Sequence, residues 1–119
     1  MKNQPFIVRM RFALMGIVAT LRREASFRTQ VGLGLAAALV LVLIRPPLVW
    51  LALCLASASA VLALELVNTA LEHLADRLHP ERHESIQLAK DCSAAAVLLA
   101  SVAALMIGAL TVAVTLGWL

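Results

Sequence analysis

Residues 92–119, CSAAAVLLASVAALMIGALTVAVTLGWL, contain no charged side chain. Two more uncharged runs cover residues 46–64 and 29–44. A helix needs about 17–25 mainly apolar residues to cross a lipid bilayer. The runs at 92–119 and 46–64 are long enough by themselves. The run at 29–44 reaches that length when the helix extends back to Ala25, with the side chain of Arg28 snorkelling to the interface. The sequence therefore predicts an all-α membrane protein with three membrane-spanning helices.

The composition of the whole chain also indicates a protein that lives in lipid. Of its 119 residues, 62% are hydrophobic and 14% are charged, and the mean hydropathy is +0.93. An ordinary soluble domain has about 25% charged residues. A short soluble chain has too little interior to bury so much apolar surface. These values disfavour a soluble enzyme or a nucleic-acid-binding protein, and they indicate a single membrane domain over residues 1–119.

Proline-containing breaks separate the predicted spans. Pro46 and Pro47 follow Arg45, and a tight turn is expected there, because proline lacks an amide proton and disfavours helix in the residue before it. The next break, His79-Pro80, comes well after the second uncharged run, so the second helix is expected to leave the membrane as a cytoplasmic extension. Helices are predicted over about residues 25–44, 48–78 and 84–116.

Ahead of the first span, residues 5–21 have the pattern of an amphipathic surface helix. Their apolar side chains recur at three- and four-residue steps, and Arg9 and Arg11 belong to the polar side. The apolar positions are Phe6, Ile7, Met10, Leu14, Ile17, Val18 and Leu21. A helix of this kind lies flat in the headgroup layer of a bilayer.

Basic residues indicate how the chain is oriented. Residues 1–28 include six basic side chains and one acidic side chain, and the link at 77–90 is also basic. Basic residues beside membrane spans mark the cytoplasmic side. We therefore expect the N-terminus and this link in the cytoplasm, and the Arg45 turn and the C-terminus on the opposite side of the membrane.

The segment 65–76, ELVNTALEHLAD, carries the polar residues of the second span. At about 100° per residue, one arc of about 80° holds four of them: Glu65, Asn68, Glu72 and Asp76. Acidic side chains in or at the rim of a bilayer are costly and normally face a partner, a cavity or a site. Asn68 alone could serve helix pairing. Three carboxylates on one stripe repel one another unless a cation lies among them, which favours a functional site.

Other polar groups are expected at the same level, where lipid headgroups meet water. Glu24 precedes the first span, and Lys90 and Asp91 precede the third uncharged run. Carboxylates bind Mg²⁺, a lysine balances phosphate charge, and one carboxylate can take a proton from an attacking hydroxyl. The set therefore suits phosphoryl transfer, although the chain has no glycine-rich nucleotide loop. Of the three histidines, His83 is the one we expect nearest a ligand.

These motifs resemble those of the small prokaryotic integral-membrane diacylglycerol kinases. The matching strings are Glu65-x-x-Asn68-Thr-Ala-x-Glu72, Asp76-Arg77, His83-Glu84, Ala89-Lys90-Asp91 with the small residues that follow, and Arg23-Glu24-Ala-Ser-Phe27-Arg28. The resemblance covers the chain from about Gly16 to its end. It implies a homotrimer with active sites between subunits, which transfers the ATP γ-phosphate to a lipid alcohol.

The resemblance also implies a role for each matching residue. Glu65 would be the catalytic base, and Glu24 and Glu72 would bind Mg²⁺. Residues implied to bind the nucleotide or its phosphates are Asn68, Glu72, Arg77, His83, Glu84, Lys90 and Asp91. Together with Glu65 and Asn68, Arg9 on the surface helix is expected to contact the lipid.

Two positions depart from the family pattern, and other functions remain open. Gln30 stands where some members have a second acid, and Gln87 replaces a small residue beside the nucleotide. The motifs favour diacylglycerol as the substrate, and undecaprenol, the substrate of a second branch of the family, is the alternative. A small transporter subunit and a non-catalytic helical assembly module are the other classes that this hydropathy would allow.

Overall fold

The computed structural model describes residues 2–119, and all of its regular structure is helical. The four helices are α1 (Phe6–Arg23), α2 (Ala25–Ile44), α3 (Leu48–Leu78) and α4 (Glu84–Thr115). Of these, α2, α3 and α4 are long and apolar enough to cross a membrane. The prediction of an all-α protein with three spanning helices and an N-terminal surface helix is therefore confirmed.

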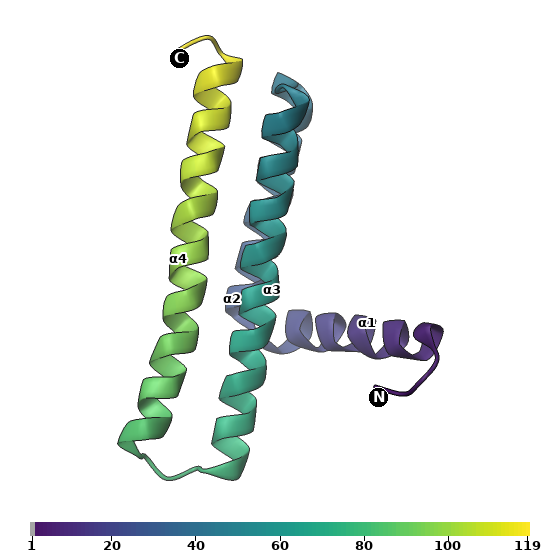
Figure 1. Cartoon of the computed structure of the whole chain (residues 1–119), viewed down its shortest axis with the longest axis vertical. Coiled ribbons are helices and arrows are strands. Elements are labelled where there is room, and N and C mark those ends of the chain that lie inside the picture. Colours follow the sequence, from purple (N-terminus) through teal and green to yellow (C-terminus); the bar gives the residue numbers. More distant parts are fainter. Residues whose placement is uncertain (1) are drawn as a thin grey trace.

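The three long helices run side by side, and α1 points away from them to one side (Figure 1). The most extensive helix contact is between α3 and α4, while α1 contacts α2 and α3 near the elbow that joins it to α2. Beyond the level of α1, α3 and α4 continue toward their common link, and the C-terminus lies at the opposite end (Figure 1). The polar segment 65–76 belongs to the part of α3 that approaches this link.

The interior of the described chain is small and mostly polar. Of residues 2–119, only six are buried: Phe27, Glu65, Asn68, Thr69, Val97 and Thr111. Large apolar side chains along all four helices are exposed instead. Lipid tails are as apolar as leucine, so helices in a bilayer associate through close packing and interhelical hydrogen bonds. The burial pattern therefore fits a multi-pass membrane protein.

Two short breaks set the directions of the helices. Arg45 ends α2 in the left-handed region, with φ at 52°, and its amide donates to the carbonyl of Leu41. Pro46 makes the right-handed helical conformation unfavourable for Arg45, and this accounts for the break where the sequence predicts a turn. Glu24 has φ −110° and ψ 111°, an extended conformation that separates α1 from α2.

Arg28 stabilises the elbow between α1 and α2. Its Nη1 atom donates to the carbonyl of Leu21 at 2.9 Å and to that of Arg22 at 3.0 Å. A cation beside the last carbonyls of a helix also interacts favourably with the helix dipole. This contact extends α1 to Arg23, two residues beyond the predicted end of the surface helix.

Replacing Arg28 with alanine is expected to loosen this elbow. The loss of two charged hydrogen bonds at an exposed helix end should cost about 1 kcal/mol of local stability. The measurement is the rate of trypsin cleavage after Arg22 and Arg23 in detergent-solubilised protein, which we expect to increase. An unchanged cleavage rate would show that other contacts hold the elbow.

Candidate active site

Glu65 lies where α3 packs against the first turns of α2. Its side chain is buried, with 6% of the residue exposed. Ser26 Oγ donates to Glu65 Oε1 at 3.2 Å, and Gln30 Nε2 donates to Glu65 Oε2 at 3.1 Å. A buried carboxylate is stable only when its oxygens have partners. The two donors from α2 therefore fix the orientation of this carboxylate within the helix bundle.

Asn68, one turn further along α3, faces α4 instead. Ser93 Oγ donates to Asn68 Oδ1 at 2.6 Å, and the same hydroxyl is 2.9 Å from the carbonyl oxygen of Lys90. Asn68 is 9% exposed. Because neighbouring positions of the stripe bond to different helices, Glu65 and Asn68 lie at the junction of α2, α3 and α4.

An ion pair connects α3 and α4 nearer their link. Lys90 Nζ lies 2.7 Å from Asp76 Oδ1. Lys90 precedes the uncharged run that begins at Cys92, so its ammonium lies near the end of the helix pair that is joined by the α3–α4 link. The hydrogen bond to Asp76, and then the charges of Asp76 and Glu72, raise the pKa of Lys90 above 10.5. Lys90 therefore stays positively charged at neutral pH, as a phosphate-binding lysine must.

Replacing Asp76 with asparagine is expected to lower the pKa of Lys90 toward its ordinary value. A lysine whose pKa is raised by folding gains stability that is complete below its ordinary pKa and is lost as the pH rises through the folded value. The effect of the variant on stability should therefore be constant near neutral pH and disappear under strongly alkaline conditions. Titration of the two ¹⁵N-labelled lysines by NMR checks this, with Lys2 as the internal control. An identical Lys90 titration in both proteins would contradict it.

Glu24 lies at the α1–α2 junction and contacts α3. The distance between Glu24 Oε1 and His73 Nε2 is 3.1 Å, and Glu72 precedes His73 on α3. The described part of the chain contains no group of three or more His, Cys, Asp or Glu side chains that could hold a metal ion. Mg²⁺ commonly takes one or two protein carboxylates and completes its shell with water and substrate phosphates. Two glutamates are therefore a compatible donor set, provided that phosphates supply further ligands.

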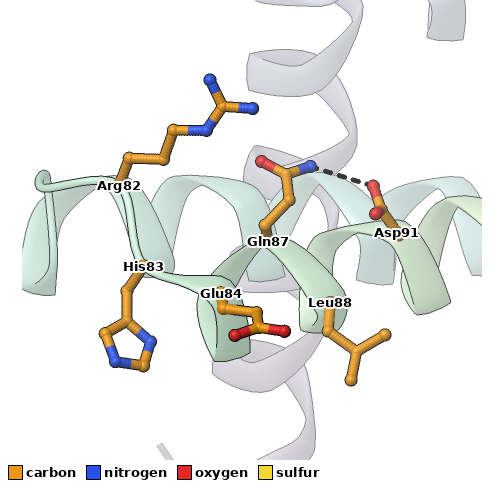
Figure 2. A pocket seen from close by; sticks show the side chains of 6 residues that line it. All are labelled: Arg82, His83, Glu84, Gln87, Leu88 and Asp91. Carbon is orange, nitrogen blue, oxygen red and sulfur yellow. Dashed lines mark hydrogen bonds between the residues drawn. The ribbon is translucent and has the colours of Figure 1, made fainter.

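A pocket of about 480 Å³ lies at the start of α4. Its lining residues are Arg82, His83, Glu84, Gln87, Leu88 and Asp91 (Figure 2). Gln87 Nε2 donates to Asp91 Oδ1 at 2.9 Å, as the dashed line in Figure 2 shows. His83 caps α4, because its Nδ1 accepts a hydrogen bond from the amide of Ser85. Both cationic and anionic side chains of this pocket are exposed, near the α3–α4 link.

The structure brings together part of the predicted set. His83, Glu84 and Asp91 line one pocket, and Asp76 and Lys90 form an ion pair. Arg77 is exposed near the end of α3, and Arg9 is exposed on α1. Neither arginine lines the pocket.

Sequence reasoning assigned no role to Ser26, Arg82 or Leu88, and it treated Gln30 and Gln87 only as departures from a pattern. One signal was available for both amides. Ser26 and Gln30 are four residues apart, as are Gln87 and Asp91, and this spacing places each pair on one helix face.

Comparisons with known proteins find relatives of this chain. A family model described as prokaryotic diacylglycerol kinase matches residues 11–112. A protein named diacylglycerol kinase from Synechocystis sp. is 34% identical over 103 residues, which cover 86% of this chain and 59% of the relative. The chain thus spans less than two thirds of that relative's length.

Two shorter relatives carry the same name, diacylglycerol kinase. The protein from Haemophilus influenzae is 31% identical over 76% of each chain. The protein from Escherichia coli K12 is 30% identical over 80% of this chain and 78% of the relative. The match of the family model covers most of the chain, including every polar residue of α3. The chain therefore belongs to the prokaryotic diacylglycerol kinase family.

Proposed function

We propose that this protein is an ATP-dependent lipid kinase that transfers the γ-phosphate to the hydroxyl of diacylglycerol and so forms phosphatidic acid. The observation that carries the proposal is the buried Glu65 carboxylate, which is held by two donors at the junction of the three long helices. A carboxylate in this position can accept a proton from an alcohol that diffuses within the bilayer. The family and the shared name of its relatives support the choice of reaction and lipid.

In this reaction, Glu65 takes the hydroxyl proton as the lipid oxygen attacks the γ-phosphorus, and the bond between that phosphorus and the bridging oxygen of ADP breaks. Lys90, which is charged at neutral pH, offsets negative charge on the phosphates. Glu24 and Glu72 are the residues that would hold Mg²⁺, and the ion supplies further positive charge to the phosphates. The Asn68–Ser93 hydrogen bond keeps the neighbouring turn of α3 in register with α4.

The pocket at the start of α4 is the proposed nucleotide site. His83, Glu84 and Asp91 line it, and Arg77, near the end of α3, would approach the phosphates. The lipid reaches Glu65 and Asn68 from the bilayer side, where α1 lies in the interface and Arg9 contacts the lipid. In this arrangement the N-terminus is in the cytoplasm, the C-terminus is outside, and the membrane is the bacterial inner membrane.

We propose that the whole chain forms one membrane domain and that three copies assemble as a homotrimer with shared active sites. The single chain leaves most of its large apolar side chains exposed and leaves Glu24 and Glu72 only partly buried. A neighbouring copy would cover part of this surface and enclose the phosphates. Chemical crosslinking in membranes, followed by electrophoresis, should give a ladder that ends at three copies.

The test of the proposed activity uses detergent-purified protein, Mg²⁺ and ATP labelled in the γ-position. Diacylglycerol and undecaprenol are supplied in separate reactions, and we expect the label to appear in phosphatidic acid. Labelled undecaprenyl phosphate alone would assign the second branch of the family. If neither lipid is labelled, the kinase proposal fails, and solute uptake by proteoliposomes without ATP consumption would support a transporter subunit.

A further inference from the structure

Two side chains of α2 hold the Glu65 carboxylate from one side. Ser26 and Gln30 are four residues apart, and their donors reach the two different oxygens of Glu65 at 3.2 Å and 3.1 Å. A carboxylate has about four lone-pair positions, two on each oxygen. The two donors therefore fix the plane of the carboxylate and leave lone pairs free for an incoming proton.

The orientation of the Gln30 amide is set by Glu65. An ionised carboxylate only accepts hydrogen bonds, so the amide nitrogen must face it and the amide oxygen must point away. Gln30 Oε1 is then buried, and the described residues give it no hydrogen-bond donor. A buried acceptor without a donor is unfavourable for folding. The Gln30 amide therefore donates to Glu65 while its own oxygen is left without a donor.

The surroundings of Glu65 contain no direct counter-ion. The ion pairs within residues 2–119 join Glu24 to His73, His79 to Glu81, and Asp76 to Lys90. Glu65 therefore depends on neutral donors for its orientation. The other ionisable groups of the helices packed around it, and of the α1–α2 junction, are Glu24, Arg28, Cys54, Glu72, His73, Asp76, Arg77, Glu84, Lys90, Asp91 and Cys92.

We propose that Gln30 and Ser26 are positioning residues, which orient the Glu65 carboxylate for proton transfer from the lipid hydroxyl. This inference rests on the proposed kinase function, since it assigns a role to two residues that act through its base. The distances and the forced amide orientation carry it. It predicts that loss of either donor lowers kcat and leaves the KM for ATP unchanged, because neither residue belongs to the nucleotide pocket.

The first experiment compares Gln30→Leu and Ser26→Ala with the wild type. Loss of a hydrogen bond to a charged group should lower kcat about 10- to 100-fold in Gln30→Leu, and less in Ser26→Ala, at an unchanged KM for ATP. Thr29→Val is the matched control, because Thr29 is exposed on the same turn of α2. If Gln30→Leu turns over like the wild type, the positioning role is wrong even though the kinase function stands.

A double-variant cycle tests whether Gln30 acts through Glu65. When Gln30→Leu is added to Glu65→Gln, the residual activity should fall no further, because the group that Gln30 orients is already lost. A further tenfold loss would show an independent role and would overturn the proposal.

Gln30→Glu separates orientation from packing. The introduced carboxyl has almost the same size, and it donates to Glu65 only while it is protonated. As the pH rises, the introduced carboxyl ionises and no longer donates to Glu65. We therefore expect the activity of this variant to be lost at a lower pH than the activity of the wild type. A pH–rate profile identical to that of the wild type would contradict the proposal.

The final readout does not depend on catalysis. With ¹³C-labelled glutamate, the infrared carboxylate band that disappears in Glu65→Gln is assigned to Glu65. Gln30→Leu should shift this band, since it removes a hydrogen bond from one oxygen, and Thr29→Val should leave it in place. An unshifted band would overturn the inference even in a preparation that phosphorylates no lipid. A shifted band in a protein that phosphorylates no lipid would support the Gln30–Glu65 hydrogen bond and contradict the proposed kinase function.

Discussion

Glu65→Gln is expected to lower kcat about 100- to 10,000-fold while the affinity for ATP stays close to that of the wild type. Glutamine has nearly the same shape and remains an acceptor for one of the two α2 donors, but it cannot take a proton from the lipid hydroxyl. Removal of this proton is the step that the proposal assigns to Glu65 alone.

The measurement combines initial rates of lipid phosphorylation with equilibrium binding of ATP. Glu81→Gln is a suitable control, because Glu81 lies in the α3–α4 link and contacts His79 rather than the site. Near-normal turnover in Glu65→Gln would remove Glu65 from the role of base. Loss of ATP binding would indicate damage to the fold instead.

Glu72→Gln should produce the second large effect, on the Mg²⁺ requirement. Glu72 is one of two carboxylates that are expected to bind the ion, and loss of a ligand should weaken Mg²⁺ binding by at least about tenfold. The half-saturating Mg²⁺ concentration, measured at constant ATP, is then expected to rise by the same factor, and kcat should fall with it.

The same variant distinguishes a kinase from an assembly module. If Glu72 serves only helix association, Glu72→Gln should change the size of the complex in detergent and leave the Mg²⁺ dependence of activity unchanged. Both quantities can be followed in one preparation, with Glu81→Gln as the charge-matched control. An unaltered Mg²⁺ titration curve would remove Glu72 from the metal site.

Much of the helical organisation follows from local features of the sequence. The bounds of α2 and α3 agree with the predicted spans because prolines and polar residues mark their ends, as at Arg45-Pro46-Pro47. The surface helix is longer than predicted, since Arg28, seven residues after Leu21, bonds the last carbonyls of α1. This contact depends on the angle between two helices, which the periodicity of either one does not contain.

The sequence shows which polar residues of α3 could form the candidate site, but not which side chains they bond to. The stripe on α3 is visible in the spacing of Glu65, Asn68 and Asp76. Which neighbouring helix each one meets depends on how α2 and α4 are rotated about their own axes. Thus the Gln30–Glu65 and Ser93–Asn68 hydrogen bonds emerge only in three dimensions. The assignment of Glu24 and Glu72 as Mg²⁺ ligands is still a prediction, because substrate phosphates would have to complete the coordination shell of the ion.

The continuation of α3 and α4 beyond the level of α1 has a kinetic consequence (Figure 1). On the proposed function, one reactant arrives by two-dimensional diffusion and is counted per unit area, and the other arrives from solution and is counted per unit volume. Adding inert carrier lipid at fixed total diacylglycerol would therefore slow the enzyme, although no bulk concentration of a reactant changes. The lipid composition of the leaflet would therefore change the rate of such an enzyme even when the ATP concentration in the cell stays constant.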